Sequence, residues 1–313
     1  MVIGIDIGYG VTKVMTHSGR VETFRTIVGV GKPDTMGVNV ADSRHRVVSV
    51  NGNTYTVGED AERFELPLIN VRKRNHIESL AYKAVILSAL SGLIANTGAE
   101  RIKVVTGLPV RFIGDTDRLK AVYKSVLPDI EVVVIPQPAG TFFDLLLDAG
   151  GNIRSSGYAK AKLGIIDIGT YTTDILMLDN MEIVRALSGS IPIGIHSLAE
   201  QVISACADKR RDLSHTEVET AMTTGYITRF GEKINITNMI NHCRASVARD
   251  IFSYVNSVWG GKEQIEVIVL TGGGSAIFSP VFKEHLSAFA NVTEPSNVFL
   301  SNVYGFYKLG MRL

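Results

Sequence analysis

Two segments that lie far apart in the chain share one order of residue types. Residues 4–13 read GIDIGYGVTK and residues 165–174 read IIDIGTYTTD. In each, an apolar run meets an aspartate, then a glycine, then small or hydroxylic residues. A glycine at such a bend permits positive φ and lets backbone N–H groups approach an anion. A carboxylate beside the bend is an oxygen ligand of the kind that Mg²⁺ requires. The two segments therefore favour binding of a phosphate chain and its cation.

A single turn of this kind is weak evidence, because Asp-x-Gly is also ordinary hairpin chemistry. Two of them, one opening each half, suggest a duplicated domain that closes on the phosphates of a nucleotide. A third segment, residues 267–275, reads VIVLTGGGS. It is a buried-type strand that leads into glycines, whose backbone can lie against a flat ring or a phosphate. Taken alone, it is equally well a glycine-rich turn after a core strand.

Five segments in order resemble the motifs of the actin/sugar-kinase/chaperone ATPase superfamily. They correspond to phosphate-1, connect-1, phosphate-2, adenosine and connect-2, at residues 6–13, 136–140, 167–174, 270–276 and 302–305. Within the superfamily the chain resembles the ParM (StbA) type of plasmid-segregation actin. That narrower resemblance rests on the short length, on Lys13 at the end of phosphate-1 and on the TGLP segment at residues 106–109.

The resemblance implies an α/β protein with the actin-like ATPase fold. Two duplicated RNase H-like α/β domains would surround a nucleotide cleft, and each would carry a small inserted subdomain. We expect the first domain at residues 1–150, with its insert at about 29–75, and the second at 151–313, with its insert at about 208–235. The C-terminal helix, at about 302–313, should pack back on the first domain.

The resemblance also assigns roles to four polar side chains. Asp6 and Asp167 would hold Mg²⁺, through its waters because this ion dehydrates reluctantly. Lys13 would place its ammonium on the β- and γ-phosphates. Gln137 would orient the attacking water, and Asp167 would accept the proton, because an amide positions water but hardly deprotonates it. Two ordinary alternatives stay open: Lys13 as a surface lysine, and Gln137 as a helix-start residue between two prolines.

The residues expected to contact the nucleotide lie in the bends or in the glycine loops. They are Gly8, Tyr9, Gly10, Lys13, Gly169, Thr170, Tyr171, Gly194, Gly272, Gly273, Gly274 and Ser275. Tyr9 stands where actin has a small hydroxylic residue, and Thr170 and Tyr171 replace a glycine-rich pair. The bulk of Tyr171 should alter the geometry of the second loop. Asp174 fits the family pattern, but we expect no direct ligand contact from it.

Alternating and apolar runs predict the elements that position these residues. The first half should contain strands at 2–6, 12–16, 20–25, 102–107 and 131–135, and helices at 78–95, 115–127 and 139–148. The second half should begin after a loop at 150–157. It should contain strands at 163–167, 172–178, 182–187 and 265–270, and helices at 195–208 and 237–259. The order of three strands, helix, strand, helix, repeated with insertions, predicts two α/β domains.

Composition limits the class of protein. A chain of 313 residues can hold two modest domains, and 45% hydrophobic with 20% charged residues is typical of a soluble globular protein. A net charge of +1 disfavours direct nucleic-acid binding, although basic triplets occur at residues 72–74 and 209–211. The seven histidines contain no H-x-x-x-H pair, which disfavours a transition-metal site.

Targeting signals are not evident in the sequence. Met1 leads at once into a strand-like run, which leaves no room for a signal peptide. No apolar run approaches the ~20 residues of a membrane span, and no terminal amphipathic helix stands out. We therefore expect a cytoplasmic protein with no membrane partner.

The leading interpretation is an actin-like ATPase that binds ATP with Mg²⁺, polymerises and hydrolyses ATP to drive filament dynamics, in plasmid or DNA segregation. By resemblance, its partners would be further copies of itself and a small DNA-binding adaptor. GTP stays open as the nucleotide, because a glycine loop discriminates bases poorly. A small-molecule kinase or phosphohydrolase of the same superfamily is one alternative, and a non-hydrolysing nucleotide-gated scaffold is another. Gln137 and the two aspartates argue against the scaffold.

Overall fold

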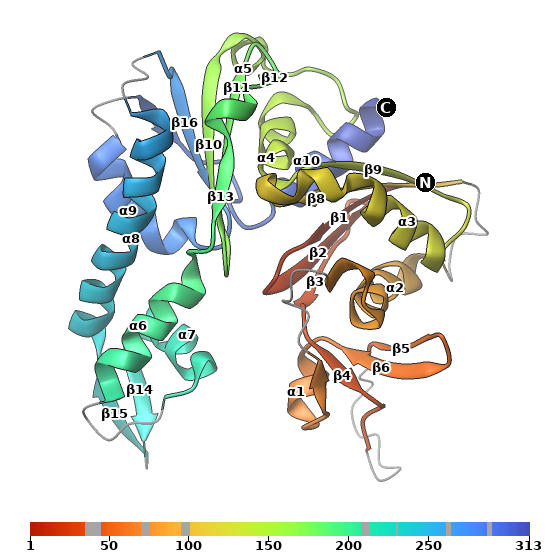
Figure 1. Cartoon of the computed structure of the whole chain (residues 1–313), viewed down its shortest axis with the longest axis horizontal. Helices are drawn as coiled ribbons and strands as arrows, with labels where there is room; N and C mark the ends of the chain where they lie inside the picture. Colours follow the sequence, from red (N-terminus) through yellow and green to blue (C-terminus); the bar gives the residue numbers. More distant parts are fainter. Residues whose placement is uncertain are drawn as a thin grey trace. The chain divides into compact units, whose positions relative to one another are not determined.

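Residues 4–13 and 165–174 contain the two turns that the sequence indicates for phosphate binding, here called the first and second candidate turns. Each turn closes a β-hairpin at one side of a mixed sheet. We describe a computed structural model of residues 1–34, 45–69, 76–94, 101–207, 213–229, 231–260, 264–286 and 290–313. Both basic triplets and parts of both expected inserts lie outside these residues. The chain divides into unit 1, Met1–Arg154 with Asn302–Leu313, and unit 2, Ser155–Ser301 (Figure 1).

The sheet of unit 1 has the strand order β3-β2-β1-β8-β9. Its members are β1 (Val2–Ile7), β2 (Val11–Thr16), β3 (Val21–Arg25), β8 (Ile102–Leu108) and β9 (Ile130–Pro136). The hairpin strands pair antiparallel, whereas β1, β8 and β9 run parallel. Apart from Asp6 near its end, the β1 strand is apolar and almost wholly buried, as parallel strands covered by helices are.

Helices and a small sheet complete unit 1. They are α2 (Leu80–Ile94), α3 (Thr116–Val126), α4 (Gln137–Leu146), α10 (Ser301–Arg312) and the 3-10 turns η1 (His76–Glu78) and η2 (Val110–Asp115). The insert holds β4 (Val28–Val30), β5 (Val47–Val50), β6 (Asn53–Val57), β7 (Leu68–Ile69) and α1 (Glu59–Arg63), with the strand order β5-β6-β4-β7. The small β insert expected here is therefore present in the described residues.

The sheet of unit 2 repeats this plan in the order β12-β11-β10-β16-β17. Its members are β10 (Lys162–Ile168), β11 (Thr173–Asp179), β12 (Glu182–Ile183), β16 (Val267–Thr271) and β17 (Asn291–Thr293), while β13 (Gly189–Ile191) also pairs with β11. The helices are α5 (Ser156–Lys160), α6 (Ile195–Ala207), α7 (His215–Thr224), α8 (Thr237–Trp259), α9 (Ser275–Leu286) and the turn η3 (Arg185–Leu187). The hairpin β14 (Tyr226–Arg229) and β15 (Glu232–Asn235) follows α7.

The close crossing of α10 and α4 requires glycine on both helices. A Cβ on Gly305 would lie 1.7 Å from the carbonyl oxygen of Gly140, and one on Gly140 would lie 2.5 Å from that of Asn302. The side chain of Asn302 accepts hydrogen bonds from the Thr141 N–H at 3.2 Å and from its hydroxyl at 2.8 Å. These contacts fix the first turn of α4, where Gln137 lies.

The structure differs from the sequence predictions in four details. The helix predicted at 139–148 begins at Gln137, because proline at its second position fits the first turn of a helix. The third strand of the second half, predicted at 182–187, ends at Ile183. There the hydroxyl of Ser188 accepts from the Met177 N–H and donates to the Val184 carbonyl, which interrupts pairing with β11. The predicted loop at 150–157 leads directly into α5, and β17 was not predicted.

Among the described residues, no helix combines the length and the apolar character that crossing a membrane requires.

Candidate active site

The first candidate turn is the bend between β1 and β2. The Gly8 N–H donates to the Val11 carbonyl at 3.2 Å, and the register places Asp6 opposite Lys13. The Lys13 ammonium donates to Asp6 Oδ2 at 2.9 Å, with 9% of Lys13 and 2% of Asp6 exposed. Lys13 is therefore no surface lysine, and its charge lies beside the bend where an anion would meet the backbone N–H groups.

Gln137 completes the polar group of unit 1. Its Nε2 donates to Asp6 Oδ1 at 2.9 Å, so each oxygen of the carboxylate accepts from a different side chain. A Cβ on Gly107 would lie 2.8 Å from Gln137 Cγ, so the glycine in the TGLP segment leaves room for this side chain. The structure thus brings together three residues from β1, β2 and α4.

Two buried phenols lie within electrostatic reach of Asp6. Burial raises the pKa of Tyr82 well above its usual value, and the neighbouring Tyr123, Tyr9 and Asp6 raise it further. Burial also raises the pKa of Tyr123, although a hydrogen bond to Thr106 opposes the rise. Both phenols therefore stay neutral.

The second candidate turn has the same backbone geometry and different charges. The Gly169 N–H donates to the Thr172 carbonyl at 2.8 Å, and the register places Asp167 opposite Asp174. The two aspartates are 8% and 4% exposed. Asp174 accepts hydrogen bonds from the hydroxyls of Thr172 at 3.2 Å and Ser190 at 2.5 Å. Asp174 thus occupies the position that Lys13 has in the first hairpin.

Opposed carboxylates on neighbouring strands repel each other, which disfavours this arrangement unless donors or a cation compensate. The hydroxyls of Thr172 and Ser190 compensate Asp174 in part. A hard cation bound through its waters is the natural further partner of such an oxygen-rich pair. The donor set of the second turn therefore fits Mg²⁺.

Glycines pack three further segments of unit 2 around the second turn. Gly272 has φ +87°, and a Cβ there would lie 2.3 Å from Asp167 Oδ1. The Gly274 N–H donates to the Ile168 carbonyl at 2.8 Å, and the buried Ser275 hydroxyl donates to the Gly272 carbonyl at 2.9 Å. A Cβ on Gly194 would lie 2.5 Å from the Gly169 carbonyl oxygen. In the structure Gly194 packs on the second turn, while its contact with the nucleoside stays a prediction.

The predicted site residues therefore form two groups. In unit 1, Asp6, Lys13 and Gln137 are joined by hydrogen bonds, beside Gly8, Tyr9 and Gly10 at the bend. In unit 2, Asp167 adjoins Gly272, and the bend of Gly169, Thr170 and Tyr171 adjoins Gly194, with Gly273, Gly274 and Ser275 in the loop after β16. Sequence reasoning gave Asp174 and Asn302 no such roles. Asp174 follows Asp167 in the sequence by the same number of residues as Lys13 follows Asp6. This equal sequence spacing could have revealed the cross-strand pair.

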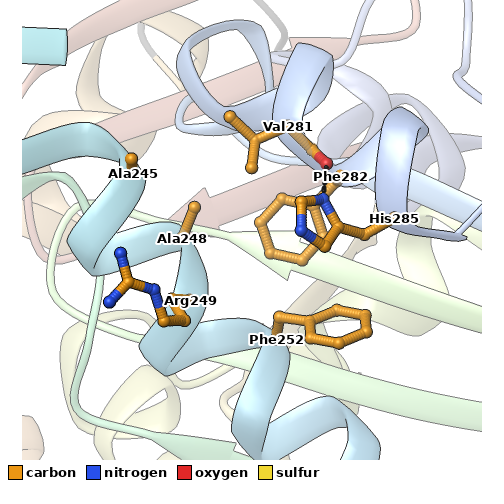
Figure 2. A pocket seen from close by; sticks show the side chains of 7 residues that line it. All are labelled: Ala245, Ala248, Arg249, Phe252, Val281, Phe282 and His285. Carbon is orange, nitrogen blue, oxygen red and sulfur yellow. Dashed lines mark hydrogen bonds between the residues drawn. The ribbon is translucent and has the colours of Figure 1, made fainter. Parts of the chain in front are cut away.

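A separate pocket of about 180 Å³ lies between α8 and α9, as Figure 2 shows. Its lining is mostly apolar and consists of Ala245, Ala248, Arg249, Phe252, Val281, Phe282 and His285. None of these residues belongs to the turns or to the glycine loop, so this pocket has no part in the candidate site.

Family models match both halves of the chain. The model of the N-terminal domain of actin-like proteins matches residues 4–140, which include the first turn and Gln137. The model of the C-terminal domain of the archaeal, MreB-like actin homologue matches residues 165–284, which include the second turn and the glycine loop. The chain is an actin-like protein. The expected actin-like α/β fold is thereby confirmed.

Solved actin-like structures superpose over the whole chain. A non-polymerisable ParM mutant, pCBH ParM, has a TM-score of 0.79 at 23% identity, and an archaeal actin homologue has 0.80 at 19%. The ParM of a 15-stranded filament from Clostridium botulinum has a TM-score of 0.77 at 23% identity. Each comparison covers 100% of this chain and 99% of the other. At these identities they show the fold, and the fold of the ParM type agrees with the expected one. None of the curated protein sequences matches this actin-like chain.

Proposed function

We propose that this actin-like protein binds ATP with Mg²⁺, assembles into filaments and hydrolyses ATP to limit filament lifetime. The observation that carries the proposal is the repeated hairpin: Asp6 opposite Lys13 in unit 1, and Asp167 opposite Asp174 in unit 2. The first hairpin would offer an ammonium to the phosphates, and each hairpin would offer one carboxylate, that of Asp6 or Asp167, to their cation. Among the structural relatives, the archaeal actin homologue forms a complex with ADP, and MamK forms a double helical filament.

The residues divide the work of hydrolysis between them. Asp6 and Asp167 would hold Mg²⁺, which when bound would neutralise charge on the phosphates. Lys13 would add its positive charge, and the N–H groups of the two bends would donate to phosphate oxygens. Gln137 would orient the attacking water, and Asp167 would accept its proton. We propose that the remaining residues expected to contact the nucleotide do so through the backbone of the bends and of the glycine loop.

We further propose that each unit corresponds to one expected domain, 1–150 or 151–313, except that residues 302–313 belong to unit 1, and that nucleotide binds both units. The function in the cell would be DNA or plasmid segregation of the ParM (StbA) type, in the cytoplasm. A net charge of +1 supports indirect attachment to DNA through a small DNA-binding adaptor. Comparing assembly and phosphate release with ATP and with GTP gives the base preference.

ATP with Mg²⁺ should convert the protein from monomer to a polymer that sediments, and phosphate release should follow assembly without any added acceptor. Light scattering, sedimentation and phosphate release should be measured on the same sample, with ATP, GTP, ADP and no nucleotide. ADP should give little polymer. A protein that stays monomeric at high concentration with ATP and Mg²⁺ would overturn the proposal of filament assembly. Turnover that begins only when a sugar from a panel of acceptors is added would identify a small-molecule kinase.

A further inference from the structure

Three side chains with metal-ligand chemistry converge in unit 2 outside the strand ends. They are His196 and Glu200 on α6, and His215, the first residue of α7. Their ligand atoms all lie within 4.8 Å of one another. His196 and Glu200 are four residues apart and share one helix face. A capping box, formed by Ser214 and Glu217, fixes the start of α7 and with it the place of His215.

The distance between His196 and Glu200 is close to that between two ligand atoms of a tetrahedral site. Donor atoms about 2.0–2.1 Å from one Zn²⁺ lie roughly 3.3 Å from each other. His196 Nε2 lies 3.5 Å from Glu200 Oε1, and His215 Nε2 is in direct contact with the same oxygen. The two imidazoles stack with centroids 4.6 Å apart and planes inclined by 12°. Both rings therefore present Nε2 to one carboxylate oxygen, and the contact between His215 and Glu200 must open to admit an ion.

Solvent can reach all three groups. The side chains of His196, Glu200 and His215 are 27%, 56% and 44% exposed. A metal ion could therefore enter without unfolding, and water could fill the fourth coordination position. An ion pair at such exposure contributes little by itself. The two imidazoles converge on one carboxylate, and because an ion lies near the plane of each imidazole that binds it, one ring must turn out of the stack to complete the ligand set.

We propose that His196, Glu200 and His215 bind a divalent transition metal of the Zn²⁺ class. Two imidazoles and one carboxylate suit Zn²⁺ or Ni²⁺, whereas Mg²⁺ and Ca²⁺ prefer oxygen ligands throughout. The sequence expectation of no transition-metal site looked for two histidines on one helix. Here the helical pair is His-x-x-x-Glu, and the second histidine comes from the next helix.

The proposed site adjoins the second turn. The ring of Tyr171 lies 4.4 Å from that of His196, and the His196 N–H donates to the Thr170 carbonyl at 2.7 Å. The metal would therefore join α7 of the insert to α6 at the point where α6 contacts the turn. Metal binding itself does not depend on nucleotide, so it can be tested independently of the proposed function.

The test is a calorimetric titration in which Zn²⁺ is added to the tag-free, nucleotide-free full chain in the presence of excess Mg²⁺. Co²⁺ serves as a spectroscopic probe, because its visible absorption reports tetrahedral coordination. We expect one Zn²⁺ per chain. His215→Ala and Glu200→Gln should each weaken binding by roughly 100-fold, the upper range for disturbing a metal site. His242→Ala removes another exposed imidazole of unit 2, on α8, and should leave the affinity unchanged.

Using both His215→Ala and Glu200→Gln separates a loss of metal binding from a loss of folding. Glu200→Gln retains the size and helix propensity of the side chain, so loss of binding at an unchanged melting temperature supports the proposal. Zn²⁺ binding that is equally tight in wild type, His215→Ala and Glu200→Gln would overturn it. So would wild-type binding with no tetrahedral Co²⁺ absorption.

Discussion

Replacing Gln137 by alanine should slow ATP hydrolysis by roughly 100-fold or more, the order expected when a reacting group loses its positioning partner. ATP binding should largely survive, because the other expected phosphate ligands remain. Filaments of the variant should last longer, since the ATP state persists.

Asp167→Ala should lose at least as much turnover, because it removes the group proposed to accept the proton. Single-turnover phosphate release and equilibrium nucleotide binding measure the two effects separately.

Gln264→Ala is a suitable control, because Gln264 is exposed and its contact with Lys162, at 3.5 Å, lies at the margin of a hydrogen bond. Its turnover should match that of wild type. If Gln137→Ala lost binding and turnover to the same degree, Gln137 would be a structural partner of Asp6. The proposed role in orienting water would then be wrong.

Replacing Lys13 by methionine should destabilise the nucleotide-free protein by about 3 kcal/mol, since removing one partner of a buried ion pair leaves an uncompensated charge. The remaining charge is Asp6, whose side chain is 3% exposed. Adding Asp6→Asn should recover much of the loss, because a neutral amide costs less to bury. Denaturant unfolding of wild type, both single variants and the double variant gives the coupling energy.

Lys103→Met provides the matched control in the same sheet. Lys103 pairs with Glu131 at 3.5 Å, but the glutamate side chain is 61% exposed, so the variant should lose no more than about 1 kcal/mol. If Lys13→Met destabilised the protein no more than Lys103→Met, the Asp6–Lys13 pair would not stabilise the first hairpin. Lys13 would then contribute to ligand binding alone and not to the stability of the fold.

Local sequence signals predicted much of the framework. Helix α8 begins and ends at the predicted residues, Thr237 and Trp259, because its apolar positions keep a helical period over its whole length. Both hairpins were predicted from an aspartate and a glycine after an apolar run. These features depend on residues close together in the chain, so one sequence contains enough information to find them.

Contacts between distant residues were less accessible. The hydrogen bond between Gln137 and Asp6 joins residues 131 positions apart, and no local pattern specifies it. The third strand of unit 2 ends early because the chain turns at Arg185–Leu187 and the hydroxyl of Ser188, in place of a strand carbonyl, accepts the Met177 N–H. The cluster of His196, Glu200 and His215 comes from two helices whose packing the sequence pattern does not define.

If both hairpins bind one Mg²⁺-nucleotide, ATP with Mg²⁺ should raise the melting temperature more than ATP with EDTA. Ligand binding stabilises the folded state in proportion to ln(1 + [L]/Kd), and without a cation the carboxylates of Asp6 and Asp167 repel the phosphates. Asp6→Asn should reduce this Mg²⁺-dependent increment, whereas Asp129→Asn, at an exposed carboxylate, should leave it unchanged.

The deciding measurement is thermal unfolding of wild type, Asp6→Asn and Asp129→Asn, each with no nucleotide, with ATP and EDTA, and with ATP and Mg²⁺. We predict a clear Mg²⁺-dependent increment in wild type and Asp129→Asn, and a smaller one in Asp6→Asn. Identical increments in all three proteins would contradict a metal site that includes Asp6. The absence of any increment in wild type would contradict Mg²⁺-nucleotide binding by the two hairpins altogether.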